Sequence, residues 1–429
     1  MNLPFLVFSD NQGKIYSHPF LRMASATAET FIAPKKDDLI VLPEGSSLFY
    51  MPKRLAVGFN PKTGLFETLK EFRGKPVYAV SAFLIPAYLR LYNPAYVVKD
   101  KKSLPLWAYA SCGFYGGKFF VTAMRIDRRI RQSPKFYDNK TIKEGVRKAL
   151  KKYPKNRLYK HLANCALNYN CLAAKNLFLQ RWEGPLPTSR FCNASCIGCL
   201  SLQESDCNAS HERINFRPEV SEIVEVAYNH LAKAKEAIVS FGQGCEGEPL
   251  LEADLIAEAA AKMREKTNRG TIHVNTNASL SSKIKLLCEV GVDSFRVSAN
   301  SVIAKMYDCY FKPRNYTFSD VRKSIEIAKS NNKFVSLNLL VFPGVTDTCQ
   351  ELKALRKFIK DTGIDMIQWR NLNIDPTYYL EHIRLKESKP VGILAMVEII
   401  KKEFPHIKMG YFNIPKEQFP ALRKNNPLP

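Results

Sequence analysis

Three cysteines near the middle of the chain have the spacing of a metal-cofactor site. Cys192, Cys196 and Cys199 form a CxxxCxxC run. Three crowded thiolates suit a cubic iron–sulfur cluster, in which three irons take protein sulfur and the fourth iron stays open for another ligand. Structural zinc is the alternative, and Cys207 or His211 could complete its four ligands. The spacing by itself leaves both open.

Polar and glycine-rich patches lie downstream of these cysteines, each after an apolar segment. They are Gly242–Pro249, Thr276–Asn277, Asn300–Ser301, Pro343–Gly344 and Arg370–Asn371. Turn-forming residues end strands for ordinary reasons, so one or two such patches would carry no information. Five patches in step with a repeating strand pattern predict one cavity, because the active sites of parallel barrels lie at the carboxyl ends of their strands.

The elements that must position these residues alternate between helices and strands. Helices are expected over 218–233, 252–267, 281–290, 318–331, 349–361 and 390–403, with strands between them over 237–241, 271–275, 294–298, 334–341 and 366–369. Repeated βα units predict a parallel sheet, and right-handed crossovers curl it into a full or partial (β/α) barrel. The predicted fold class is α/β.

The chain before this barrel has a different pattern. Residues 1–125 contain short strand-like segments and proline-bearing loops, with a hairpin expected at 106–124 that turns at a Tyr-Gly-Gly-Lys sequence. Two amphipathic helical segments follow. Cys165 and Cys171 lie here at a spacing that does not share a helix face, so a joint metal site would need a bend between them. We divide the chain into a β-rich basic N-terminal domain (1–125), linking helices (126–185), a barrel core (186–375) and a C-terminal extension that completes or covers the barrel (376–429).

These motifs together resemble the radical S-adenosylmethionine (radical SAM) superfamily, over a stretch from about Phe191 to Asn373. The CxxxCxxC run matches the cluster motif that follows the first barrel strand of that superfamily. The resemblance implies contacts to S-adenosylmethionine from Gly247 and Glu248, which match the end of a GGE(P) motif, from Ser298 and Asn300 on the fourth strand, and from the fifth-strand segment that contains Asn338. The order and spacing of the four motifs make the match specific.

Two departures from the superfamily pattern affect the expected site. The residue before the last cysteine is usually aromatic, whereas here it is Gly198, which leaves adenine packing to Ile197 or a later side chain. The second-strand motif is also longer than the usual form, so Glu246 competes with Glu248 for its role. Either acid could instead be an ordinary residue at a helix N-terminus, stabilised by the helix dipole.

The resemblance implies an enzyme with a [4Fe–4S] cluster and S-adenosylmethionine as cofactors. An electron from an external flavodoxin- or ferredoxin-like donor would cleave S-adenosylmethionine to methionine and a 5′-deoxyadenosyl radical, which abstracts hydrogen from a substrate. The substrate is not indicated. Arg370 at a predicted strand end could pair with an anionic substrate, with the cofactor carboxylate or with a structural partner. The absence of cysteine after Cys349 argues against a C-terminal auxiliary cluster.

The positive charge of the chain is concentrated in its first part. The net charge is +24, and residues 1–190 hold 32 Lys and Arg against 12 Asp and Glu, a net of +20. Such a field attracts polyanions, so we interpret this region as the substrate side, with RNA as one candidate and a solvated basic surface as the alternative. With no long apolar run and no secretory signal, a cytosolic protein outside the membrane is expected.

Two function classes therefore follow from the sequence. In the first, the chain is a radical SAM enzyme whose substrate is unidentified and could be a macromolecule. In the second, the cysteines hold non-catalytic zinc or an iron–sulfur cluster in a protein that binds polyanions. The strand–helix array after Cys199 favours the first, because a structural zinc site alone does not require it.

Overall fold

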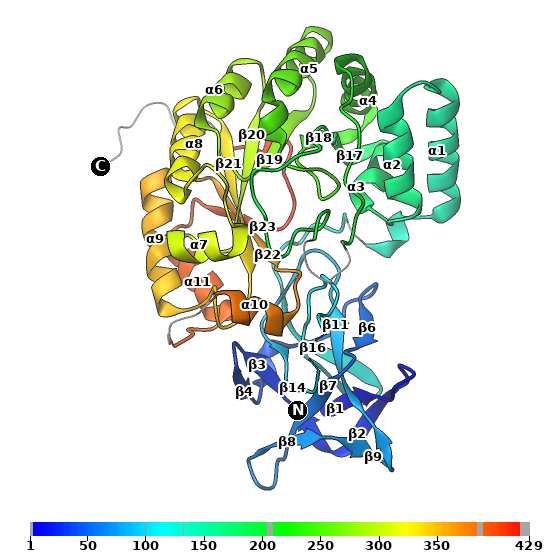
Figure 1. Cartoon of the computed structure of the whole chain (residues 1–429), viewed down its shortest axis with the longest axis vertical. Coiled ribbons are helices and arrows are strands. Elements are labelled where there is room, and N and C mark those ends of the chain that lie inside the picture. The colour runs from blue at the N-terminus through cyan, green and yellow to red at the C-terminus, as the bar shows by residue number, and fades with distance from the viewer. Residues whose placement is uncertain (1–2, 101, 132, 204–208, 384–388, 421–429) are drawn as a thin grey trace.

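The computed structural model describes residues 3–100, 102–131, 133–203, 209–383 and 389–420. Cys207, considered above as a zinc ligand, lies outside this set. Figure 1 shows a β-rich part, blue to cyan, at one end of an α/β part whose helices surround a parallel sheet. None of the described helices is both long and apolar enough to cross a lipid bilayer.

The β-rich part consists of antiparallel sheets, the largest with eleven strands. Its strands are β1 (Phe5–Ser9), β2 (Ile15–Met23), β3 (Ser25–Thr27), β4 (Thr30–Ile32), β5 (Leu39–Val41), β6 (Ser47–Tyr50), β7 (Arg54–Phe59), β8 (Phe66–Leu69), β9 (Glu71–Phe72), β10 (Lys75–Pro76), β11 (Tyr78–Phe83), β12 (Tyr88–Arg90), β13 (Asn93–Pro94), β14 (Tyr96–Val98), β15 (Cys112–Tyr115) and β16 (Lys118–Arg125). The expected hairpin is β15–β16. Tyr115 pairs with Lys118, and Gly116 and Gly117 both have positive φ, as a two-residue hairpin turn requires.

Three helices follow the β-rich part: α1 (Asn139–Lys152), α2 (Arg157–Leu167) and α3 (Leu172–Phe178). The first two match the predicted segments, and each begins at a side-chain cap, since Asp138 accepts from the Thr141 N–H and Asn156 from the Tyr159 N–H. The third was not predicted, because its few residues give little periodic signal. Apolar side chains of all three belong to the same buried core as the barrel.

The α/β part is built on seven parallel strands that pair in chain order. They are β17 (Arg181–Pro185), β18 (Lys235–Phe241), β19 (Thr271–Thr276), β20 (Ser294–Ala299), β21 (Phe334–Val341), β22 (Met366–Asn371) and β23 (Lys408–Gly410). The predicted parallel sheet is therefore confirmed. Within the described residues the first and last strands do not pair, so the barrel is partial and open along one side.

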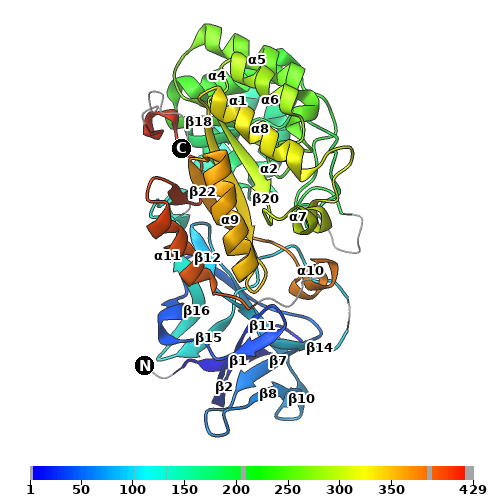
Figure 2. The same cartoon turned by 90° about the vertical axis from the view of Figure 1, so that its left-hand side faces the viewer.

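Helices cover the outer face of this sheet, as the two views in Figures 1 and 2 show. The helices of this part are α4 (Val220–Lys233), α5 (Ala253–Lys266), α6 (Ser281–Glu289), α7 (Ala304–Phe311), α8 (Phe318–Ser330), α9 (Cys349–Thr362), α10 (Pro376–Ile383) and α11 (Ile393–Glu403), and all except α7 and α10 belong to this outer layer. Six of them match predicted ranges. The short α7 and α10 were not predicted, and both lie at the carboxyl ends of the strands, where they follow β20 and β22.

The β-rich part packs against the carboxyl ends of β21 and β22. The Arg54 guanidinium forms a fully buried ion pair with Asp375 at 3.0 Å. The Arg90 backbone N–H donates to the Asn371 side chain at 2.9 Å. Gly344 lies so close to the backbone at Ala28 that an added Cβ would be 2.1 Å from the Ala28 nitrogen. The β-rich part therefore borders the end of the barrel where the sequence predicts the site.

Candidate cluster and cofactor site

A cavity of about 350 Å³ opens at the carboxyl ends of the parallel strands. Pockets for small molecules typically have volumes of about 300–1,000 Å³. The volume of this cavity lies in that range, so it can hold a cofactor of modest size. Eight of the nine predicted site residues line it: Cys192, Cys196, Cys199, Gly247, Glu248, Ser298, Asn338 and Arg370. The ninth, Asn300, is fully buried outside the lining, where its amide donates to the Met306 carbonyl and to the Tyr379 hydroxyl.

The cysteine loop follows β17 and is held in place by the C-terminal end of α7. The Ser195 N–H donates to the Phe311 carbonyl and the Ile197 N–H to the Tyr310 carbonyl, both at 3.0 Å. Burial raises the pKa of Cys192 to about 11, so this group is a thiol until a cation lies beside it. Metal coordination deprotonates such a thiol, which makes the loop a suitable donor set for a cationic cluster.

The spacing of the three thiols differs from that of sulfur ligands around a single ion. Sulfur ligands around one zinc ion lie about 3.8 Å apart, because each Zn–S bond is about 2.3 Å and the geometry is tetrahedral. Cys192, Cys196 and Cys199 do not form a group with all three sulfurs within 4.8 Å of one another; in the described residues only one such group of ligands occurs, and it lies elsewhere. The wider spacing suits a cluster of several irons.

Glu246 and Glu248 both bind protein groups, so neither carboxylate is free for the cofactor. Glu246 is buried and accepts from the backbone N–H groups of Thr188, Ser189 and Gln243 at 2.7–3.0 Å. It thereby fastens the loop before the cysteines to the loop after β18. Glu248 accepts from the backbone N–H of Asn277 at 2.8 Å and from that of Leu250, as a cap of the turn at Pro249–Glu252.

The alternative role considered for these acids, that of ordinary residues at a helix N-terminus, is therefore partly correct, since Glu248 does cap a short helical turn. Burial raises its pKa to about 7, which follows from a carboxylate held away from solvent. The loop offers backbone groups to a ligand rather than carboxylates. The N–H of Gly247 donates to the Ser189 carbonyl at 2.7 Å, so this glycine lies directly against the loop segment between β17 and Cys192.

An unpaired acceptor on β21 indicates where a ligand hydroxyl would bind. Asn338 is 8% exposed and lines the cavity, and its amide donates to the Ser298 hydroxyl at 3.1 Å. Its side-chain oxygen has no partner among the described residues. A buried acceptor without a donor costs about 1–3 kcal/mol, which a ribose hydroxyl from a bound ligand would recover. The pair Ser298 and Asn338 therefore fits a cofactor with a sugar.

Tyr310 occupies the space that an aromatic residue before Cys199 would otherwise fill. A Cβ added to Gly198 would lie 2.8 Å from the Tyr310 hydroxyl oxygen and 3.3 Å from its ring. Tyr310 and Phe311 also line the cavity, whereas Ile197 is buried in the core. The sequence indicated only that Ile197 or a side chain later in the chain would pack against the adenine. The aromatic run in the segment after Asn300 was the available signal, and it requires α7 to be placed beside the cysteine loop.

Arg296 on β20 and Arg370 on β22 line the cavity, and neither has a carboxylate partner within 4 Å among the described residues, although the Glu183 carboxylate interacts with Arg296 at longer range. Arg370 donates to the Tyr411 carbonyl at 3.1 Å, and its guanidinium lies 4.1 Å from the centre of the Tyr411 ring. Arg296 donates to Gln368 at 3.2 Å, and its Nε has no partner in the described part of the chain. Burial lowers the pKa of Arg296 to about 10, and it remains charged at neutral pH. The structural ion pair considered for Arg370 is thus not found within the part of the chain that the structure describes.

A buried polar network lies beneath the cavity, inside the barrel. The Glu183 carboxylate on β17 accepts from Ser240 at 2.7 Å and from Asn413 at 2.9 Å. His273 on β19 is 2% exposed and hydrogen-bonds Ser294 at 2.6 Å and Asn275 at 3.0 Å. Glu183 on the first strand of the sheet is therefore joined to Asn413, which follows the last strand.

The His273→Gln substitution should make folding less sensitive to acid. Burial lowers the pKa of His273 to about 4, against 6.5 for the free imidazole. Between these values the unfolded chain binds more protons, so the stability contributed by neutral His273 is complete above pH 6.5 and is lost as pH falls toward 4, by about 2–3 kcal/mol. Urea unfolding of both proteins at about pH 7.5 and about pH 5 measures this. An identical loss in the variant would contradict it.

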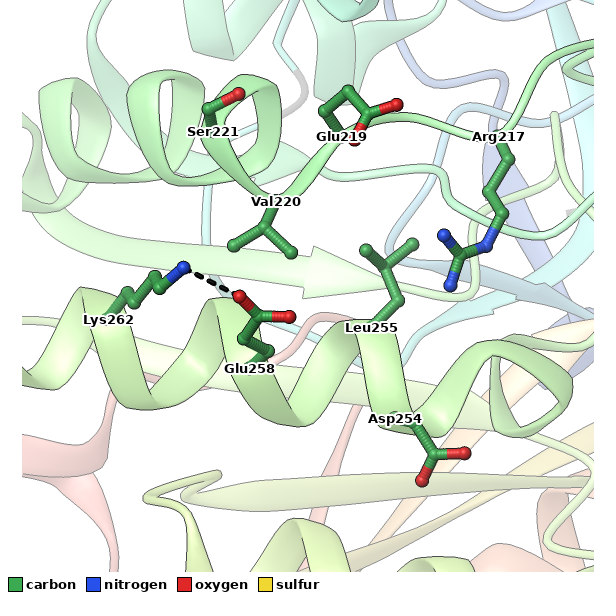
Figure 3. Close-up of a pocket in the computed structure, with 8 residues that line it drawn as sticks. All are labelled: Arg217, Glu219, Val220, Ser221, Asp254, Leu255, Glu258 and Lys262. Atoms are coloured by element: carbon green, nitrogen blue, oxygen red, sulfur yellow. Dashed lines mark hydrogen bonds and ion pairs between the residues drawn. The ribbon is translucent and has the colours of Figure 1, made fainter.

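Two further hollows lie near the barrel. One has a volume of about 470 Å³ and lies between the start of α4 and α5. Its charged side chains, drawn in Figure 3, are mostly exposed and include the Lys262–Glu258 ion pair, which measures 2.6 Å. Nothing in it resembles a catalytic group. The other, of about 240 Å³, lies on the outer side of the cysteine loop. Cys196 and Cys199 line it together with Arg213 and Lys312. This second hollow gives the cysteines a basic outer face.

The fold and the site define a class of protein: a partial parallel (β/α) barrel with a three-cysteine loop after its first strand and a ligand cavity at the strand ends. Residues 186–359 match the family model of the radical SAM superfamily. The chain therefore contains a radical SAM domain, whose cofactors are a [4Fe–4S] cluster and S-adenosylmethionine.

Several solved structures are similar to this chain at low identity. Native anSMEcpe with bound AdoMet has 20% identity and a TM-score of 0.35, over 44% of this chain and 52% of that one. HydG, a maturase of the [FeFe]-hydrogenase, has 16% identity and a TM-score of 0.37, over 63% and 66%. SuiB of Streptococcus suis bound to S-adenosylmethionine has 16% identity and a TM-score of 0.37, over 61% of this chain and 60% of that one. The matches thus span about half to two thirds of those chains, and no curated protein matches this sequence.

Proposed function

We propose that this chain reductively cleaves S-adenosylmethionine and uses the product to abstract hydrogen from a substrate that carries an anionic group. The observation that carries the proposal is the single cavity that contains all three loop cysteines together with Asn338 and Arg370. A non-catalytic cluster would need no such cavity. Cys192, Cys196 and Cys199 would hold the cluster, which supplies the electron for the cleavage when it is bound.

The side chains of the cavity have distinct tasks in this proposal. Ser298 and Asn338 bind the ribose through the unpaired amide oxygen, and Tyr310 packs against the adenine in place of the missing aromatic at position 198. The backbone at Gly247 and Glu248 takes the amino group of the methionine part. Leu340 and Leu372 give the cavity apolar walls, which limit the number of stray hydrogen donors near the reacting carbon.

Arg370 is assigned to the substrate rather than to the cofactor. The proposed cofactor contacts lie after β18 and on β20 and β21, and Arg370 is one strand further, on β22. The next residues, Asn371 and Leu372, contact Arg90 of the β-rich part. Arg296 is the second guanidinium on this side of the cavity. Two arginines without a carboxylate within 4 Å among the described residues suit a phosphate or carboxylate of the substrate, and Glu183 balances the charge of Arg296 only at longer range.

Asn338→Ala should raise the Kd for S-adenosylmethionine about fivefold to tenfold, because about 1 kcal/mol of hydrogen bonding is lost. Arg370→Met should leave this Kd within about twofold, since the variant keeps an unbranched apolar stem and loses the guanidinium, a group that the cofactor does not use in this proposal. Equilibrium dialysis with anaerobically reconstituted protein measures both. A loss of affinity in Arg370→Met as large as that in Asn338→Ala would reassign Arg370 to the cofactor carboxylate.

RNA remains one candidate for the substrate. Its support is the basic charge of residues 1–190, part of which lies on the exposed side chains of Lys143, Arg147 and Lys151 along α1. Aromatic side chains of the β-rich part give less support, since pairs such as Phe8 and Phe72 pack on each other with ring centres 4.9 Å apart. If RNA binds, its affinity should fall steeply with added salt, as fluorescence anisotropy measures. No binding at low salt would remove this candidate.

Anaerobic reconstitution tests the function itself. The loaded protein should contain about four irons and four sulfides per chain. After reduction with S-adenosylmethionine it should release 5′-deoxyadenosine and methionine, detected by chromatography. An external flavodoxin- or ferredoxin-like donor is expected to replace the chemical reductant. A folded chain that takes up no cluster and releases no 5′-deoxyadenosine would overturn the proposal and leave the alternative of a non-catalytic protein that binds polyanions.

A further inference from the structure

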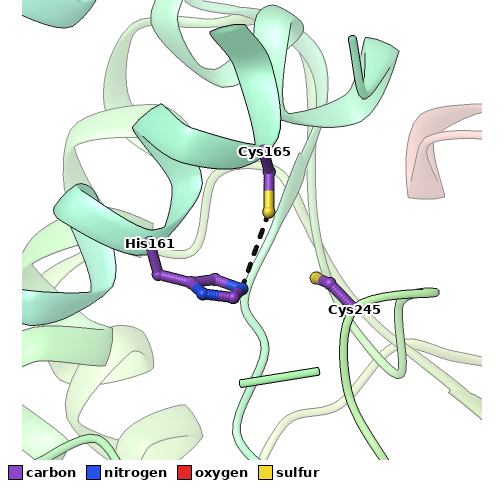
Figure 4. A group of neighbouring side chains, drawn as sticks. All are labelled: His161, Cys165 and Cys245. Carbon is purple, nitrogen blue, oxygen red and sulfur yellow. Dashed lines mark hydrogen bonds between the residues drawn. The ribbon is translucent and has the colours of Figure 1, made fainter. Parts of the chain in front are cut away.

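A second group of metal-type ligands lies behind the cavity wall, apart from the three loop cysteines. His161 and Cys165 are on α2, and Cys245 is in the loop after β18 (Figure 4). Their ligand atoms all lie within 4.8 Å of one another. Cys165 and Cys245 are buried, and His161 is half-buried. The chain separates Cys165 from Cys245 by eighty residues, so the fold brings this group together.

The local structure places the first two ligands on one side of α2. His161 and Cys165 are four residues apart, which puts them one helical turn apart on the same face. The His161 Nε2 and Cys165 Sγ atoms are 3.6 Å apart. A tetrahedral zinc ion with bonds of about 2.0–2.1 Å to nitrogen and about 2.3 Å to sulfur requires a separation of about 3.6 Å. The helix thus presents two ligands at the spacing of a single ion.

A further imidazole, His211, lies in the loop that connects the cysteine loop with α4, outside the group whose ligand atoms are all within 4.8 Å of one another. The backbone N–H of His211 donates to the carbonyl of Leu200, the residue after Cys199, at 3.0 Å. Its imidazole lies within electrostatic range of Cys165 and packs against Tyr169 with ring centres 5.8 Å apart. Its Nδ1 is buried and has no partner among the described residues. A buried imidazole nitrogen without a donor or acceptor is costly unless a ligand reaches it.

We propose that His161, Cys165 and Cys245 bind a structural Zn²⁺ ion, and that His211 moves in from outside this group to become the fourth ligand. Binding replaces two thiol protons, which are released to solvent, by two Zn–S bonds, and no electron transfer is involved. Two thiolates and two imidazoles are a donor set that zinc prefers. This zinc site shares no ligand with the cluster site at the loop cysteines, and it does not depend on the proposed radical chemistry.

The position of this site gives it a specific effect. Cys245 lies next to Glu246 and two residues before Gly247, in the loop that forms one wall of the cofactor cavity. The zinc ion would fasten α2 to that loop across the outer side of the barrel. Because the free energy of metal binding adds to the free energy of folding, the ion would hold the loop in the conformation that the cavity needs.

A full-length variant with Cys192, Cys196 and Cys199 replaced by alanine tests the site without the cluster. Co²⁺ titration should saturate at one equivalent and give the intense visible bands of tetrahedral cobalt together with thiolate-to-cobalt absorption in the near ultraviolet. Zn²⁺ should displace the cobalt. Adding Cys165→Ala or Cys245→Ala should abolish the spectrum, and adding Cys288→Ala, a buried cysteine in α6, should leave it unchanged. His211→Ala should weaken binding and alter the bands.

Metal analysis of the otherwise unmodified chain gives an independent measurement. Anaerobically purified protein should contain one zinc per chain in addition to cluster iron, and Cys165→Ala should lose the zinc and keep the iron. Absence of stoichiometric zinc or cobalt from folded protein would overturn the proposal, as would zinc that persists in both Cys165→Ala and Cys245→Ala. Failure of the radical chemistry would show in 5′-deoxyadenosine and would leave the zinc content unchanged.

Discussion

Cys196→Ala should reduce the formation of 5′-deoxyadenosine to the detection limit, whereas Cys288→Ala should leave it at the wild-type rate. Cys196 lies in the middle of the cysteine loop and lines both the cofactor cavity and the basic hollow on its outer side. A cube held by two thiolates instead of three has a second open iron and is unstable. The loss should therefore appear in iron and sulfide content as well as in turnover.

Cys288 is the matched control for this substitution. It is a buried thiol in α6, 5% exposed, and it is neither on the cavity wall nor in a group of metal-type ligands. Its truncation removes a similar volume and so reports the cost of losing a buried sulfur alone. Normal folding of Cys196→Ala, checked by circular dichroism, separates cluster loss from unfolding. Wild-type turnover by folded Cys196→Ala would exclude the loop as the cluster site.

The barrel was predictable because its signals are local and repeat along the chain. The strands 237–241 and 334–341 were expected from their apolar runs, and they appear as β18, which begins two residues earlier, and as β21, which has the predicted bounds. The same holds for the cysteine loop, whose three ligands are close in sequence. Residues whose function depends on a fixed spacing within one segment can be found without a structure.

Other parts of the site depend on contacts between distant segments and were not predictable. Tyr310 fills the space beside Gly198 only because α7 packs on the cysteine loop, and a separation of more than a hundred residues gives no periodic signal. Cys165 was considered with Cys171, its neighbour in sequence, but the fold places it against Cys245. Asn300 lies on the expected strand end, yet its side chain turns toward Tyr379 on α10, a helix that was not predicted.

Gly247→Ala should lower the free energy of unfolding by at least about 3 kcal/mol and cause loss of most of the iron. An added Cβ at this position would lie 1.9 Å from the Phe191 carbonyl oxygen and 2.4 Å from its carbon. These are backbone atoms of the segment that leads directly to Cys192, so neither can move without displacing the cluster loop. Overpacking of this kind costs more than the usual 1–3 kcal/mol because no flexible side chain can yield.

Gly244→Ala, three residues earlier in the same loop, is the matched control. Its added Cβ would be 3.5 Å from the nearest atom, a side-chain carbon of Leu200, which is an ordinary contact. Gly to Ala at a compatible position changes stability by only about 0.4–1 kcal/mol, through the unfolded chain. Urea unfolding and iron analysis of both reconstituted variants measure the contrast. Gly247 also donates its N–H to the Ser189 carbonyl at 2.7 Å. Equal stability and equal iron content in the two variants would mean that the loop after β18 does not pack against the segment before Cys192 in solution.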